Sequence, residues 1–185
     1  MADELLDIYD ENNQSLGFTK PRFLVHQDGD WHRVVHVYVI NDQGQYLVHL
    51  RSPYKDLKPD CWDTHFGGHL TSGMNYEQGA ITEIEQEIGL KINPQLLITG
   101  DIVKHSSSFN KEHGQRYFYR FNGKLSELSF NDNEVIAVKW LSFAEIMKTI
   151  EHNPKIWANN PERFKIADSL RRELIKESGL IKEII

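Results

Sequence analysis

A strand, a glycine-rich loop and an amphipathic helix follow one another over residues 62–89, and this unit constrains the fold more than any other segment. The helix is indicated by apolar residues at spacings of three and four, which place them on one face. These residues are Ile81, Ile84 and Ile88. Asn75 is a candidate N-cap and Gly89 a candidate C-terminal stop. The pattern predicts a helix that packs on a core through its isoleucines.

The other face of this predicted helix is acidic. Glu83 and Glu87 lie one turn apart, roughly 140–240° around the axis from Ile81. Like charges at this spacing repel each other, and a divalent cation between them removes that cost. Hard oxygen ligands suit Mg²⁺ or Mn²⁺. The alternative interpretation, a solvated acidic face, is common on surface helices.

Gly67-Gly68-His69 precede the helix. Glycines allow backbone amides to approach a phosphate closely, and the helix N-terminus adds partial positive charge. The strand, loop and helix together therefore indicate a phosphate-binding unit beside a metal site.

The rest of the chain alternates between strand and helix patterns. Residues 41–44 form a turn between two β-branched and aromatic runs, which predicts a hairpin. The predicted strands are Val34–Ile40, Tyr46–Arg51, Ile98–Val103, Gln115–Phe121 and Val135–Leu141. Ser142 and Glu145 have capping-box spacing ahead of a helix to Ile150. A last helix is predicted from Pro161, capped by Asn160, to about Glu177 before Gly179.

This order of elements predicts a single α+β domain over residues 1–185, with a mixed sheet between helices (α/β/α). Its core is expected at about 30–150, with the C-terminal helix at about 161–177.

Composition narrows the functional classes. The net charge of −6 argues against broad binding to nucleic-acid polymers. No apolar run approaches the ~18–20 residues of a membrane span. The single cysteine, Cys61, cannot form an internal disulfide, so we expect a cytoplasmic protein. An acidic protein that binds a phosphorylated small molecule needs metal ions or a few well-placed Arg and Lys side chains.

Residues 68–90 resemble the Nudix box, G-x5-E-x7-R-E-U-x-E-E-x-G-U, where U is a bulky aliphatic residue. The matching positions are Gly68, Glu83, Ile84, Glu87, Gly89 and Leu90. Three positions depart from the pattern: Met74 and Thr82 replace a Glu and an Arg that pair in the family, and Gln86 replaces a glutamate that ligates metal. Losing both members of a pair leaves no orphan charge. The Gln86 amide can still coordinate Mg²⁺, but it holds the ion more weakly than a carboxylate.

The segment before the box resembles type I isopentenyl-diphosphate isomerases, through Arg51, Lys55, Pro59 and Trp62-Asp63. This resemblance implies that Arg51 and Lys55 grip a diphosphate, which suits a guanidinium fork and an ammonium. It also implies that the matching histidines bind a metal: His26, His32 and His69. The alternative is that they are surface or hydrogen-bonded side chains. Of the two later glutamates in the isomerase site, at most Glu112 is retained.

Isomerase activity is nevertheless not expected. Gly67 stands at the position of the catalytic cysteine and Gly114 at that of the catalytic acid. Moving a proton on and off an alkene needs a positioned acid and base. Cys61 lies six positions too early to substitute.

The resemblance implies Mg²⁺- or Mn²⁺-dependent hydrolysis of a diphosphate linked to another group. Glu83, Gln86 and Glu87 are the expected metal ligands, and Glu83 or Glu87 positions or deprotonates the water. Glu134 is a further candidate ligand or base, or else a strand-edge charge. Gly67 and Gly68 are expected to contact the substrate. The alternatives are a binding module that retains diphosphate recognition without turnover, and an interaction scaffold.

Gln86→Glu tests the altered box. The added carboxylate repels Glu83 and Glu87 without metal and is neutralised with it. We expect a lower melting temperature in chelator, a higher one in saturating Mg²⁺, and faster phosphate release. A variant that melts lower in both conditions and hydrolyses nothing would favour the binding module.

Overall fold

The central sheet is mixed, as predicted. The computed structural model describes residues 4–55, 57–107, 110–130 and 133–178. For residues 177 and 178 it describes the backbone only. The long strands are β3 (Trp31–Ile40), β4 (Tyr46–Arg51), β6 (Leu97–Ser106), β7 (Lys111–Arg120) and β8 (Val135–Leu141). β3 runs parallel to β7, and β6–β7 and β4–β8 are antiparallel. The short β5 (Trp62–Asp63) pairs with β4.

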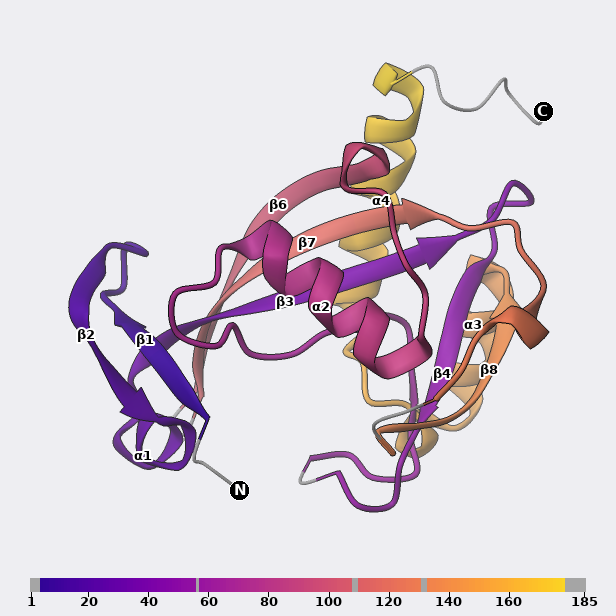
Figure 1. Cartoon of the computed structure of the whole chain (residues 1–185). Helices are drawn as coiled ribbons and strands as arrows, with labels where there is room; N and C mark the ends of the chain where they lie inside the picture. Colours follow the sequence, from indigo (N-terminus) through magenta and orange to yellow (C-terminus); the bar gives the residue numbers. More distant parts are fainter. Residues whose placement is uncertain (1–3, 56, 108–109, 131–132, 179–185) are drawn as a thin grey trace.

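β3 and β4 form the predicted hairpin. Ile40 pairs with Tyr46 beside the turn, and the two strands then diverge (Figure 1). β3 continues along β7, while β4 continues along β8. β6 and β7 are longer than predicted. Their polar ends lack the alternation of apolar residues that marks a strand, and they are extended because they pair with neighbouring strands.

Helices cover both faces of the sheet (Figure 1). α2 (Tyr76–Ile88) covers one face, where Ile84 and Ile88 pack with Val35 and Phe66. α3 (Phe143–His152) and α4 (Pro161–Ser178) cover the other, where Tyr38 packs with apolar side chains of both helices. Alternate residues of β3 thus serve two cores, which confirms the α/β/α arrangement. No helix of the described residues is long and apolar enough to cross a membrane.

The N-terminal elements were not predicted. They are β1 (Leu5–Tyr9), β2 (Ser15–Pro21) and α1 (Arg22–Asp28). β2 pairs with β1 and is mostly exposed, so it lacks the alternation that marks a half-buried strand. α1 has seven residues, too few for a clear helical period. Short 3₁₀ turns occur at Pro94–Leu96, Leu125–Glu127 and Pro154–Ile156.

The predicted helix caps are confirmed. The Asn75 side chain accepts from the Gln78 amide at 2.8 Å, and Gly89 ends α2 in the left-handed region with φ 66°. The Asn160 side chain accepts from the amide of Glu162 at 2.9 Å at the start of α4. Gly179, predicted to follow α4, lies outside the described residues.

Ser142→Ala is expected to lower the free energy of unfolding by about 0.5–2 kcal/mol, because the Ser142 hydroxyl caps α3. Its Oγ accepts from the Glu145 amide at 3.3 Å, and the Glu145 carboxylate accepts from the Ser142 amide at 2.7 Å. Urea unfolding at neutral pH measures the change. Lys148→Ala, at an exposed position of the same helix, is the control; equal effects of the two substitutions would contradict the capping role.

Candidate active site

The glycine loop and the acidic face of α2 are in contact. The Gly67 amide donates to Oε2 of Glu87 at 3.0 Å. Gly68 lies against Glu83 so closely that an added Cβ would stand 2.9 Å from both carboxylate oxygens. The structure therefore brings together the predicted loop and the predicted pair of glutamates.

Gly67 leaves no room for a side chain. Its φ is 141°, and a Cβ would lie 2.0 Å from the carbonyl oxygen of Val35. A cysteine at this position would require the backbone to move. This is a structural reason, additional to the sequence, against isomerase chemistry at Gly67.

Glu87 is buried among charges of its own sign. It is 2% exposed, and burial raises its pKa well above the usual value, with Glu83 and Glu134 adding to the effect and Lys55 opposing it. Lys55 also forms an ion pair with Glu134. Carboxylate oxygens gathered in this way are the donors that a hard divalent cation prefers.

The altered box positions have different environments. Met74 is partly buried against the apolar cluster under α2, so the family's ion pair is replaced by an apolar contact. Gln86 is exposed on α2, one position before the buried Glu87. Its role as a metal ligand stays a prediction.

Arg51 is engaged within the protein. Its Nε donates to the Lys58 carbonyl at 3.2 Å and Nη2 to the Leu57 carbonyl at 2.9 Å, while Nη1 lies 3.4 Å from the Asp63 carboxylate. In this conformation the guanidinium shapes the segment between β4 and β5. Its contact with a diphosphate also stays a prediction.

The three predicted histidines converge although they come from separate elements. His26 lies on α1, His32 on β3 and His69 after the glycine loop, and one ring nitrogen from each lies within 4.8 Å of the others. The Nε2 atoms of His26 and His69 are 3.1 Å apart. Among the described residues, these three histidines form the group of His, Cys, Asp or Glu side chains whose potential metal-ligand atoms lie within 4.8 Å of one another.

The chemistry of this histidine cluster suits a divalent metal. His32 Nδ1 lies 3.1 Å from the Asp30 carbonyl, to which it can donate, while its buried Nε2 has no hydrogen-bond partner among the described residues. The Nε2 atom lies 3.9 Å from Glu112. Burial lowers the pKa of His32 and, further, that of His69. Neutral rings keep a lone pair for a metal, and the carbonyl fixes the tautomer that offers it.

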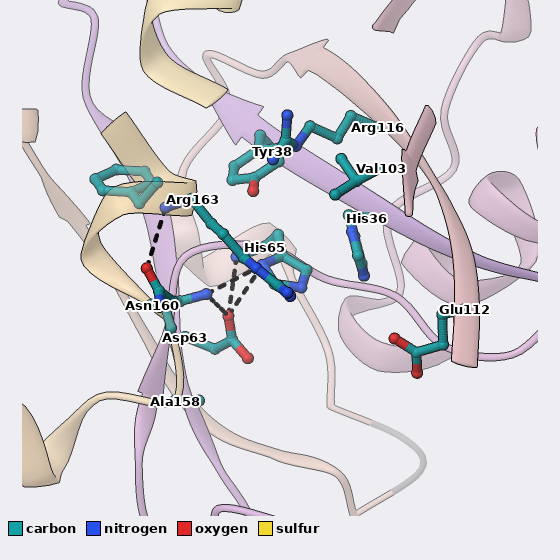
Figure 2. Close-up of a pocket in the computed structure, with 12 residues that line it drawn as sticks. His36, Tyr38, Asp63, His65, Val103, Glu112, Arg116, Ala158, Asn160 and Arg163 are labelled. Carbon is teal, nitrogen blue, oxygen red and sulfur yellow. Dashed lines mark hydrogen bonds and ion pairs between the residues drawn. The ribbon is translucent and has the colours of Figure 1, made fainter. Parts of the chain in front are cut away.

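A pocket of about 200 Å³, which the sequence did not predict, is lined mainly by polar side chains (Figure 2). Its walls come from β3, β5, β6, β7 and the start of α4. The residues that carry polar groups are His36, Tyr38, Asp63, His65, Glu112, Arg116, Asn159, Asn160 and Arg163. His36, from β3, lines this pocket beside His65. In the sequence, the feature that could have indicated this pocket is the pair of alternate polar residues, Asp63 and His65, just before the two glycines.

Two further ring side chains belong to the core. His49 is buried and stacks on Phe66 with ring centroids 4.6 Å apart. Trp157 is 2% exposed and belongs to the apolar cluster under α3 and α4.

Comparison with known proteins gives a consistent result. The NUDIX domain family matches residues 30–164. An uncharacterized Nudix hydrolase from Nostoc is 32% identical over 88% of this chain and 89% of its own length. An isopentenyl-diphosphate Delta-isomerase from Escherichia coli is 28% identical over 80% of this chain and 79% of its own. The crystal structure of DR0079 from Deinococcus radiodurans has a TM-score of 0.66 at 24% identity, covering 91% of this chain and 98% of that one, and shares the fold.

Glu87→Gln tests the buried carboxylate. Because the folded-state pKa of Glu87 is raised, metal-free protein loses stability as pH rises from the ordinary glutamate value through the folded-state pKa. The amide removes this loss, so in chelator at about pH 8 the variant should melt above wild type, with the difference shrinking toward about pH 5. Mg²⁺ should raise the melting temperature of wild type more than that of the variant. A variant that melts lower in chelator throughout, with no Mg²⁺ shift in either protein, would contradict the metal site.

Proposed function

Because the chain belongs to the NUDIX domain family, we propose that it is a hydrolase of a diphosphate linked to a second chemical group, with Mg²⁺ or Mn²⁺ as cofactor. The observation that carries the proposal is Glu87, buried beside Glu83 and Glu134 and held by the Gly67 amide. Neighbouring carboxylates raise the pKa of Glu87, and a bound cation would favour its charged form instead.

Each residue of the site has a distinct role in this proposal. Glu83 and Glu87 hold the metal, with Gln86 as a weaker neighbouring ligand. The metal, when bound, neutralises phosphate oxygens and activates water. Glu134, paired with Lys55 before substrate arrives, is released as an acidic ligand or base when Lys55 turns to the diphosphate. The amides of Gly67 and Gly68 and the side chain of Arg51 complete the contacts to the phosphates.

The histidine cluster is proposed as a second metal site. His26, His32 and His69 offer three nitrogen ligands, and Glu112 offers an oxygen 3.9 Å from His32. Nitrogen and carboxylate donors in this combination suit a transition metal such as Mn²⁺ or Zn²⁺.

A diphosphate-binding module without turnover is the second candidate. Gln86 favours it, because one charged ligand of the box is missing. Phosphate release separates the two: a screen of diphosphate esters with Mg²⁺ and with Mn²⁺ should give turnover that is lost in Glu87→Gln. Tight binding of the same esters without product would instead support the module. An absence of ligand stabilisation altogether would support a scaffold.

The proposal also predicts the effects of replacing two positively charged side chains, Arg51 and Lys55. Arg51→Ala should weaken diphosphate binding by about 1.5–3 kcal/mol, the cost of a hydrogen bond to a charged group. Lys55→Met should weaken it to a similar extent. Calorimetry with inorganic diphosphate and Mg²⁺ measures both, with Lys58→Met, at an exposed position of the same segment, as control. Unchanged affinity in a folded Arg51→Ala protein would assign Arg51 to loop structure alone.

A further inference from the structure

The polar pocket carries charges of both signs on its walls. Its carboxylates and guanidinium groups belong to Asp63, Glu112, Arg116 and Arg163. In the view of Figure 2, Arg116 lies above the pocket, and Asp63 and Glu112 lie below it. A ligand in this space therefore meets donors at one end and acceptors at the other. An apolar ligand would cover both without replacing their hydrogen bonds to water, which is unfavourable.

The size of the pocket limits the ligand to a small molecule. Its volume of about 200 Å³ is the share of roughly seven water molecules in the liquid. A molecule with a similar number of non-hydrogen atoms fits within it, whereas a nucleotide does not. Asn160 and Arg163 are exposed, so the pocket is open to solvent at the start of α4. The lining includes neither the glycine loop nor Glu83 or Glu87, so this space is separate from the proposed diphosphate site.

Both arginines can take a further acceptor. Arg116 is 3% exposed and pairs with Asp101 through Nη1 at 3.0 Å, while its buried Nε has no hydrogen-bond partner among the described residues. A buried donor without an acceptor is costly unless a ligand or water supplies one. Arg163 contacts the imidazole of His105 at 2.7 Å. Because carboxylates form the stronger, charge-assisted contact with a guanidinium, a ligand carboxylate suits these two side chains.

The acidic end of the pocket is fixed and charged. Oδ1 of Asp63 accepts from the Thr64 amide and from the Asn159 side chain, each at 2.7 Å. Burial disfavours the charge of Asp63, but nearby histidine and arginine side chains lower its pKa to about 2. Oε1 of Glu112 accepts from the Asn110 side chain at 2.6 Å. Each carboxylate has about four acceptor positions, so further donors, such as those of an ammonium group, can be accommodated.

Two imidazoles lie between these ends without adding charge. The ring centroids of His36 and His65 are 4.5 Å apart, and both residues line the pocket. Burial lowers the pKa of His65 and, further, that of His36, so both rings are neutral at neutral pH. Two positive and two negative side chains thus line a small space whose remaining polar groups are neutral.

We propose that this pocket is a binding site for a small zwitterion of the α-amino-acid type, with its carboxylate at the guanidinium groups and its ammonium at the carboxylates. A ligand with one charge of each sign matches walls that carry both signs. A phosphate monoester, which carries close to two negative charges, would be repelled by both carboxylates. A short ligand side chain has apolar contacts available from Val103, Ala158 and Phe164.

The first test detects binding at the imidazoles. Glycine, L-alanine, L-serine, L-threonine and L-valine are titrated one at a time into the metal-free full chain, because amino acids also chelate metals. The imidazole resonances of His36 and His65 are followed by NMR. At least one amino acid should shift both, whereas His152 on α3, 2.7 Å from the Lys148 carbonyl, should not shift. No shift with any of the five, or equal shifts in all three rings, would overturn the site.

The second test removes one ligand charge at a time. The amino acid that binds most tightly is compared with its N-acetyl form, which lacks the ammonium, and with its amide, which lacks the carboxylate. Each derivative should bind at least about tenfold more weakly, because each loses a charge-assisted hydrogen bond. An N-acetyl form that binds as tightly as the free amino acid would overturn the zwitterion and indicate a site for simple carboxylates.

Arg163→Met tests the carboxylate end. The variant should bind the free amino acid about tenfold more weakly, but it should bind the amide as wild type does, within about twofold. Lys165→Met is the matched control, because Lys165 lies on the same helix, is 49% exposed and pairs with Glu162. It removes the same charge and should leave both affinities unchanged. Equal losses in the two variants, or an equal loss for the amide in Arg163→Met, would overturn the proposal.

Discussion

The hydrogen bond from the Gly67 amide to Glu87 joins the two parts of the molecule on which the site depends. The loop is anchored to β3, where the Val35 amide donates to the Gly68 carbonyl at 3.0 Å and Val37 exchanges hydrogen bonds with Phe66. Glu87 is anchored by α2, whose isoleucines fill the core beneath it. A buried carboxylate is unfavourable unless its charge is compensated. The sheet and the helix therefore hold a buried carboxylate in place, and in the proposed function a divalent cation compensates its charge.

The short segment around Phe66 separates three environments. The Phe66 ring points into the core under α2, and the loop beside it contacts the carboxylates of α2. His65 faces the polar pocket on the other side of the sheet. His69, at the end of the segment, joins His26 and His32. One backbone segment thus connects the acidic face of α2, the polar pocket and the histidine cluster.

The structure accounts for some of the differences between this chain and the related sequences, but not for Gln86. Met74 packs against the core, so its loss of charge is offset by apolar contact. Gly67 cannot be replaced by a cysteine, because the Val35 carbonyl occupies the space. Gln86 is exposed and has no such structural reason. The chain therefore keeps the strand, loop and helix of the box while three of its side chains differ from the family pattern.

The sequence by itself determined the features that depend on local periodicity and capping. These are the isoleucine face of α2, its Asn75 and Gly89 ends, the β3–β4 hairpin and the glycine loop ahead of two glutamates. Family resemblance added the three histidines. The tertiary structure decided how distant residues meet: α1, too short to predict, brings His26 to His69, and Arg51 donates to the Leu57 and Lys58 carbonyls between β4 and β5. The pocket is formed by residues of β3, β7 and the start of α4, among others. Residue spacing within one element cannot predict it, because strand pairing and the packing of α4 on the sheet bring these residues together.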